Sequence, residues 1–81
     1  MRRELIEAGK TYADAKGGRR KVIDIGPDGW GETCVQYALL AGKNTSKPLS
    51  HDDTGNPIFG CYVHSFQVWA KQIIESGPDA Q

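Results

Sequence analysis

Two cysteines and two histidines give this chain the ligand types of a zinc site. Cys34, His51, Cys61 and His64 make a numerically complete Cys2His2 set. The spacing argues against a shared ion, because Cys61 and His64 are three residues apart on a predicted strand and so lie on opposite faces, about 10 Å apart. Zinc needs its ligands about 2.0–2.3 Å from one centre. We therefore expect Cys61 to be a small core residue and the histidines to be surface groups, with zinc binding as an alternative and no cofactor required.

Two adjacent pairs, His64-Ser65 and His51-Asp52, have the side-chain types of a nucleophile and its base. Neighbours in sequence are rarely oriented to share a proton along the required line. Ser65 is better explained as a helix N-cap, because its hydroxyl can accept an otherwise unpaired backbone N–H. The chain is therefore expected not to be an enzyme.

An aromatic residue beside a turn is the strongest candidate for a binding residue. Trp30 directly follows Pro27-Asp28-Gly29, a strong turn signal, so it belongs to a predicted hairpin tip. Burial is harder to arrange there than for Trp69, although the indole could fold back over the sheet. An exposed tryptophan indicates a contact site, either for a base or for a pocket on a partner protein. Tyr12, Tyr37 and Tyr62 could line a groove with it, although each suits a strand face equally well.

Positive charge gathers near the N-terminus, since residues 1–21 hold seven of the ten Lys and Arg. Lys16, Arg19, Arg20 and Lys21 lie in a predicted hairpin over 16–21 and could each contact a phosphate. With Trp30 nearby, these cations would suit a single-stranded nucleic acid. However, the formal net charge is zero and the pI is near 6.7, unlike a dedicated nucleic-acid-binding domain. Simple solvation of a surface hairpin is the other reading.

These residues must be positioned by a small set of strands and one helix. Alternating apolar residues predict strands at 19–25, 33–40 and 58–64, after a shorter one at 9–12. In the first of these runs, Ile23 and Ile25 share a face. In the last, the face formed by Phe59, Cys61 and Val63 is expected to be core.

The end of the chain predicts an amphipathic helix over 65–75, ended by Gly77-Pro78. Its apolar stripe comprises Phe66, Trp69, Ala70, Ile73 and Ile74. Residues 76–81 would form a flexible tail. Residues 42–57 form a long polar loop, and its lack of anchoring apolar side chains favours a mobile loop over a binding loop.

A length of 81 residues predicts one domain, 1–81, and ten glycines and four prolines indicate many turns, which suits an all-β or α+β class. Glu4 and Glu7 follow the first two arginines, so no signal peptide is indicated, and no run is long enough to span a membrane. A cytoplasmic protein without a membrane partner is expected, with both thiols free.

The arrangement Gly9-x-x-Tyr12, Gly18-x-Arg20-x-Val22-x-x-Ile25, Val35-x-Tyr37 and Ser65-Phe66-x-x-Trp69-Ala70 resembles small SH3-like barrel proteins of bacteriophages and prophages. The resemblance implies an SH3-like β-barrel, or strongly bent antiparallel sheet, with a C-terminal capping helix and no enzymatic activity. The acidic-aromatic motif of the proline-rich-peptide groove is absent, so that ligand is not carried over.

The sequence thus predicts a binding module whose partner is a protein, and the resemblance implies a phage or prophage accessory factor. The candidate contact residues are Arg19, Arg20, Lys21 and Trp30. Nucleic-acid binding through the hairpin 16–21 is the first alternative. The partner's identity and the oligomeric state are left open.

Overall fold

A computed structural model describes residues 1–74 as a six-stranded antiparallel sheet with one short α-helix. The elements are η1 (Arg3–Leu5), β1 (Thr11–Ala13), β2 (Arg19–Pro27), β3 (Thr33–Ala41), β4 (Ser50–His51), β5 (Pro57–Tyr62), α1 (Val63–Trp69) and β6 (Gln72–Ile74). The mainly β class with a helix near the C-terminus is confirmed. Glu75, Gly77-Pro78 and the predicted tail 76–81 lie outside the described residues.

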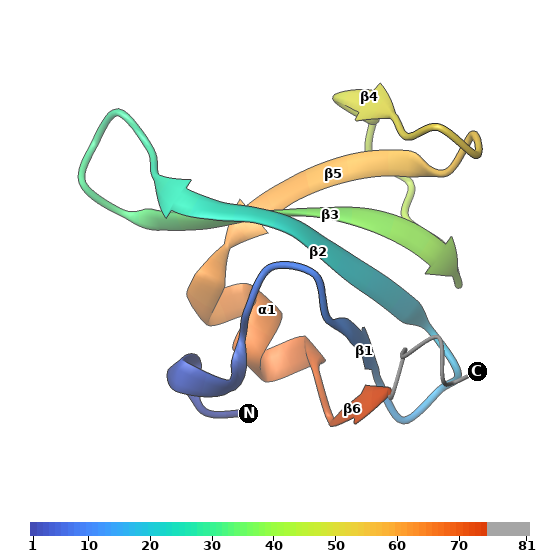
Figure 1. Ribbon diagram of the computed structural model, residues 1–81, viewed down its shortest axis with the longest axis horizontal. Coiled ribbons are helices and arrows are strands. Elements are labelled where there is room, and N and C mark those ends of the chain that lie inside the picture. The colour runs from blue at the N-terminus through green and yellow to red at the C-terminus, as the bar shows by residue number, and fades with distance from the viewer. Residues whose placement is uncertain (75–81) are drawn as a thin grey trace.

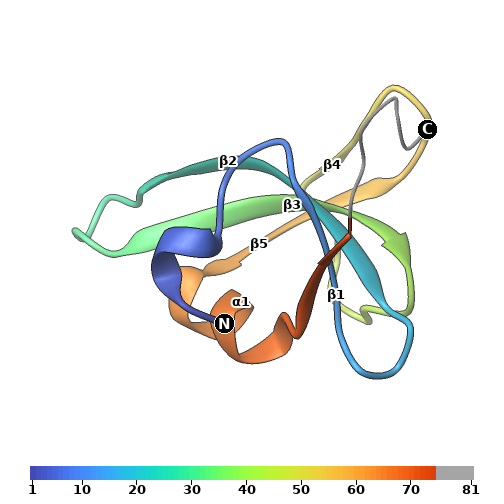
Figure 2. The same ribbon diagram turned by 60° about the horizontal axis from the view of Figure 1, so that its bottom comes forward.

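The strand order is β4-β5-β3-β2-β1-β6, with every pairing antiparallel. The long strands β2 and β3 form the centre, and β5 continues from β3. The last strand returns to β1, where Ile73 lies opposite Tyr12. Among the described residues β4 and β6 are the two edges, so the sheet is bent but not closed. Figures 1 and 2 show it curving around α1.

The core lies between the concave side of the sheet and α1. Its buried residues are Ile6, Tyr12, Val22, Val35, Tyr37, Phe59, Phe66 and Ala70. Phe66 is completely buried, and its ring meets Tyr12, Tyr37 and Trp69. The predicted common interior is confirmed, since Phe59 is buried too and Cys61, Val63 and Trp69 are partly buried against the same cluster.

The predicted helix over 65–75 is wrong at both ends, because α1 runs from Val63 to Trp69. Its N-cap is Tyr62, with no side-chain cap, and Ser65 is exposed within the helix. At Ala70 the backbone becomes extended, and the Lys71 N–H donates to the Ala13 carbonyl at 2.8 Å. Pairing with β1 then satisfies those backbone groups of Gln72–Ile74 that face β1. The β-branched Ile73 and Ile74 suit this strand, so a tertiary contact overrides the helical pattern.

The predicted grouping of Ile23 with Ile25 is also wrong, because β2 contains a bulge. Val22 lies opposite Tyr37 and Asp24 lies opposite Gln36, which leaves Ile23 as an extra residue. An extra residue shifts the alternation of the side chains. Val22 is therefore completely buried and Ile25 packs against the core, whereas Ile23 is 42% exposed.

This bulge makes a matched pair of truncations informative. Val22→Ala removes two buried methyl groups and should cost about 2 kcal/mol of unfolding free energy. Ile23→Ala removes a larger but half-exposed side chain and should cost under about 1 kcal/mol. Urea unfolding of both variants measures the difference. A larger loss in Ile23→Ala would contradict the bulge.

The predicted loop 42–57 contains structure that its composition did not indicate. Ser50 and His51 form β4, which pairs with β5, and the Leu49 N–H donates to the Ile58 carbonyl at 2.8 Å. Asn44 anchors the first half, because its Nδ2 donates to the Tyr37 hydroxyl at 3.0 Å. Strand β5 also ends at Tyr62, two residues earlier than predicted, because Val63 and His64 begin α1.

Three hairpin loops share one local design, an Asp followed three residues later by Gly. They are 14–18, 28–32 and 52–56. In each, the Asp Oδ1 accepts the backbone N–H groups two and four residues ahead, and the glycine has a φ of +87°, +88° or +86°. That φ region strongly favours glycine. The repeated pattern Asp-x-x-Gly therefore fixes all three loops.

Among residues 1–74 no helix has the length and apolar character needed to cross a membrane.

Candidate functional site

Trp30 projects from the tip of the β2–β3 hairpin, where 90% of its surface is exposed. The loop beneath it is held firmly. Asp28 Oδ1 accepts the Trp30 N–H at 2.7 Å and the Glu32 N–H at 2.9 Å, and the Asp28 N–H donates to the Glu32 carbonyl at 2.7 Å. Figure 1 shows this loop extending at one end of the sheet. The expected exposure of Trp30 is thus confirmed, on a loop that these hydrogen bonds close.

A groove opens on the outer face of β2, β3 and β5, next to the Trp30 loop. We call it the outer groove; its volume is about 480 Å³. It is lined by Asp24, Gly26, Pro27, Asp28, Cys34, Val35, Gln36, Leu49, Gly60, Cys61 and Tyr62. The volume falls within the range of about 300–1,000 Å³ common for ligand sites.

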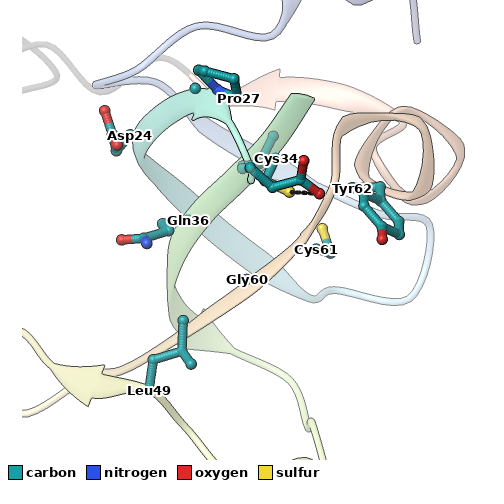
Figure 3. Close-up of a pocket in the computed structure, with 11 residues that line it drawn as sticks. Asp24, Pro27, Cys34, Gln36, Leu49, Gly60, Cys61 and Tyr62 are labelled. Atoms are coloured by element: carbon teal, nitrogen blue, oxygen red, sulfur yellow. Dashed lines mark hydrogen bonds between the residues drawn. The ribbon is translucent and has the colours of Figure 1, made fainter. Parts of the chain in front are cut away.

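Small residues on the strands explain why the outer groove is hollow. Gly26 and Gly60 carry no side chain, so the sheet surface lies low there. Leu49 reaches in from the segment before β4, and a Cβ built on Gly60 would lie 3.4 Å from its Cδ1. Figure 3 shows Leu49 and Tyr62 on either side of Gly60. Both side chains are largely exposed, Leu49 by 65% and Tyr62 by 53%.

The charged residues of the outer groove and of the adjoining loop are acidic. Asp24 and Asp28 line the outer groove, Glu32 belongs to the adjoining loop, and no Lys or Arg is among the lining residues. Hydrogen bonds from the backbone N–H groups of Trp30 and Glu32 lower the pKa of Asp28 below its ordinary value, so this carboxylate is ionised at neutral pH.

Cys34, one of the two cysteines that line the outer groove, lies beside a carboxylate that disfavours its thiolate form. Cys34 Sγ lies 3.8 Å from Asp28 Oδ2, as the dashed line in Figure 3 shows. Desolvation, and then the negative charge of Asp28, raise the pKa of Cys34. A raised pKa keeps the thiol protonated at neutral pH, whereas reactive cysteines have lowered pKa values.

The ionised Asp28 carboxylate gives a testable pH dependence. Because its pKa is lower in the folded than in the unfolded protein, its stabilising effect is complete above about pH 4 and is lost as the pH falls through the folded pKa. Asp14 and Asp52 also have lowered pKa values. Replacing all three with Asn should keep the hydrogen-bond acceptors but lower the stability at neutral pH and flatten its decline in acid.

Urea unfolding near neutral pH and near pH 2 measures this effect. Asp28→Asn alone should also reduce the loss of unfolding free energy in acid, but by less than the triple variant does. Asp28→Ala, which also lacks the acceptor, should be the less stable of the two Asp28 variants at both pH values. An unchanged acid-induced loss in the triple variant would contradict the assigned role of the three carboxylates.

The structure separates the other predicted contact residues from Trp30. Arg19, Arg20 and Lys21 begin β2 whereas Trp30 follows its end, and a nine-residue strand is about 25 Å long. Figure 1 shows the β1–β2 and β2–β3 loops at opposite ends of the sheet. The expected neighbourhood of the cations and Trp30 is therefore wrong.

The three cations do not form one surface either. The guanidinium of Arg20 packs over the rings of Tyr37 and Trp69 on the inner side of the sheet. Lys21 instead lines a hollow with Ile23, Ala38 and Leu40, on the other side. Alternation along β2 accounts for this split. Arg19 is exposed.

The four predicted zinc ligands do not come together. Within residues 1–74 no three His, Cys, Asp or Glu side chains are placed so that they could hold a metal ion. His51 is exposed on the edge strand β4, and His64 is exposed on α1. Cys34 and Cys61 are both free thiols.

Sequence reasoning missed several residues of this site. It gave Asp28 no role beyond the turn, although the Asp-x-x-Gly spacing, repeated in three loops, marks an aspartate that caps its own hairpin. Leu49 was the single large apolar residue of a polar segment, which was a usable signal. Tyr62 was not missed, since it was one of three tyrosines expected either in a groove with Trp30 or on a strand face, and of the three it is the one that lines the outer groove.

Comparison with protein-family models, with curated proteins and with solved structures found no match to this chain.

Proposed function

We propose that this protein is a non-enzymatic module that binds another protein through Trp30 and the outer groove. The 90% exposure of Trp30 on a hydrogen-bonded loop is the observation that carries the proposal. Tryptophan is enriched among the residues that dominate binding energies. An anchor on an ordered loop also loses little conformational freedom when it binds.

The chemistry of the site narrows the kind of partner. Leu49, Tyr62 and Trp30 offer exposed apolar surface, and Asp24, Asp28 and Glu32 add negative charge around it. A complementary surface would have an apolar pocket for the indole, bordered by Lys or Arg side chains. The same acidic residues would repel nucleic-acid phosphates, so the tryptophan does not support the nucleic-acid alternative.

The strand order supports the more specific fold that the resemblance implies, an SH3-like barrel. The strands β1, β2, β3 and β5 follow one another as antiparallel neighbours, α1 comes next, and β6 returns to β1. Docking surfaces on such a scaffold would be carried by its loops. A cytoplasmic location would suit the two free thiols. The phage or prophage origin and the accessory role stay predictions.

Affinity capture from the organism that encodes the protein tests the proposal. Wild-type bait should retain a protein that Trp30→Ala bait does not retain. Val68→Ala is the matched control, because Val68 is also an exposed apolar residue, at 60%, but lies on α1. Retention of the same proteins by wild-type and Trp30→Ala baits would argue against the proposal.

A further inference from the structure

Arg20 is a partly buried arginine without a carboxylate partner in the described residues. The two ion pairs found within residues 1–74 join Arg2 to Glu4 and Lys10 to Glu7. Its Nε is buried and has no hydrogen-bond partner there. A buried donor without an acceptor is costly, so such an atom calls for an explanation.

Aromatic rings hold this guanidinium in place. Its Cζ lies 4.1 Å from the centroid of the Trp69 ring and 4.6 Å from that of Tyr37. Tyr37 is itself buried and hydrogen-bonded to Asn44, and the Trp69 ring packs on Phe66. An arginine fixed by packing loses little further freedom when it binds an oxyanion, and its planar donors match two oxygens at once.

Arg20 lines a hollow of about 360 Å³ at the end of the sheet opposite Trp30, which we call the basic hollow. Its other lining residues are Asp14, Lys16, Gly18, Leu39, Ala41, Gly42, Lys43 and Trp69. Three of the lining residues are cationic and one, Asp14, is acidic. Asp14 Oδ1 is already engaged with the N–H groups of Lys16 and Gly18, at 3.0 and 2.7 Å. The lining thus has two positive charges in excess.

We propose that the basic hollow binds a small phosphate monoester, with its phosphate on Arg20, Lys16 and Lys43. A phosphate monoester carries close to two negative charges at pH 7, which balances the excess. With a small shift of the Arg20 side chain, a phosphate oxygen could also satisfy the unpartnered Nε. The hollow is in the size range of small-molecule sites, and Leu39 and Trp69 provide an apolar wall for the organic part.

The placement of the neighbouring cations favours a small ligand over a nucleic acid. Lys21 lines a different hollow on the other face of the sheet, so it does not extend the cationic lining of the basic hollow. The guanidinium also covers part of the Trp69 ring, which limits stacking of a base on it.

Isothermal titration with ribose 5-phosphate tests the proposal, with ribose and inorganic phosphate as comparison ligands. We expect ribose 5-phosphate to bind, inorganic phosphate to bind more weakly, and ribose not to bind. Equal binding of ribose 5-phosphate and inorganic phosphate would contradict the monoester, because the organic part would then contribute nothing. NMR should show shifts at the Arg20 Nε–H and at the amides of Gly18 and Gly42. Absence of binding by both phosphates would overturn the proposal.

Variants then locate the site. Arg20→Lys keeps the charge but loses the paired donors and should weaken ribose 5-phosphate binding about tenfold. Arg19→Lys is the matched control and should bind as wild type. Lys43→Ala, at an exposed position, should weaken binding without loss of stability, which keeps the test valid if Arg20→Lys is unstable.

Two results would contradict the basic hollow. One is an equal loss of binding in Arg19→Lys and Arg20→Lys. The other is binding of a single-stranded oligonucleotide that depends on Lys21 as strongly as on Lys43, since this would place phosphate recognition on the open surface of β2. Phosphate binding at the basic hollow does not depend on the proposed protein-binding surface. Trp30→Ala should therefore leave ribose 5-phosphate binding unchanged.

Discussion

Replacing Phe66 with Ala should remove most of the stability of this protein. Phe66 is completely buried, and its ring lies 5.3–5.7 Å, centroid to centroid, from those of Tyr12, Tyr37 and Trp69. A Phe→Ala change in such a core costs about 3–5 kcal/mol. A domain of this size is expected near the low end of the usual range of about 5–15 kcal/mol. The variant should therefore be largely unfolded at moderate urea concentrations where the wild type is folded.

Val68→Ala is the appropriate control, because it truncates an exposed residue of the same helix. It should change the unfolding free energy by less than about 0.5 kcal/mol. Circular dichroism during urea titration measures both variants. A loss below about 1 kcal/mol in Phe66→Ala would mean that α1 does not complete the core.

Replacing Trp30 with Ala should have the opposite profile, a large loss of binding with almost no loss of stability. The indole is 90% exposed, so its removal takes away little of the folded protein's packing. Tryptophan anchors typically contribute 2 kcal/mol or more to binding, which corresponds to a loss of affinity of about 30-fold or more. Titration of the captured partner measures the affinity, and thermal unfolding of the free variant measures the stability.

Two further truncations test which part of the surface contacts the partner. Tyr62→Ala lies in the outer groove and should weaken the same interaction by a smaller factor, whereas Val68→Ala should not weaken it. A large drop in the melting temperature of Trp30→Ala would instead assign Trp30 a structural role. Equal affinities for Trp30→Ala and the wild type would remove the indole from the interface.

Alternation and turn signals were enough to predict much of the sheet. The strand β3 lies within one residue of the expected strand at 33–40, because the alternation from Val35 to Tyr37 places apolar side chains on the buried face. Likewise, Pro27-Asp28-Gly29 marked the β2–β3 turn, and the exposure of Trp30 followed from its place beside that turn. These features depend on local chemistry, which the sequence displays directly.

The errors arose where distant contacts decide the local structure. Ile73 and Ile74 match the apolar stripe of a helix, but their backbone pairs with β1 and forms the strand β6 instead. The bulge at Ile23 depends on the register between β2 and β3, which no local pattern reveals.

The candidate site was predicted only in part for the same reason. Trp30 was found because exposure at a turn is a local property. The grouping with Arg19, Arg20 and Lys21 failed because the sequence distance between residues 21 and 30 is short, whereas an extended strand separates them in space. Placing Arg20 against Trp69 required knowledge of how α1 packs on the sheet.

The fluorescence of Trp30 tests the docking role most directly. In a Trp69→Phe variant Trp30 is the single tryptophan, so its emission reports on the hairpin tip alone. Addition of the captured partner should shift this emission to shorter wavelength and protect it from acrylamide quenching, as the indole enters an apolar pocket. An emission and a quenching rate that stay those of a fully exposed indole in the saturated complex would contradict the account.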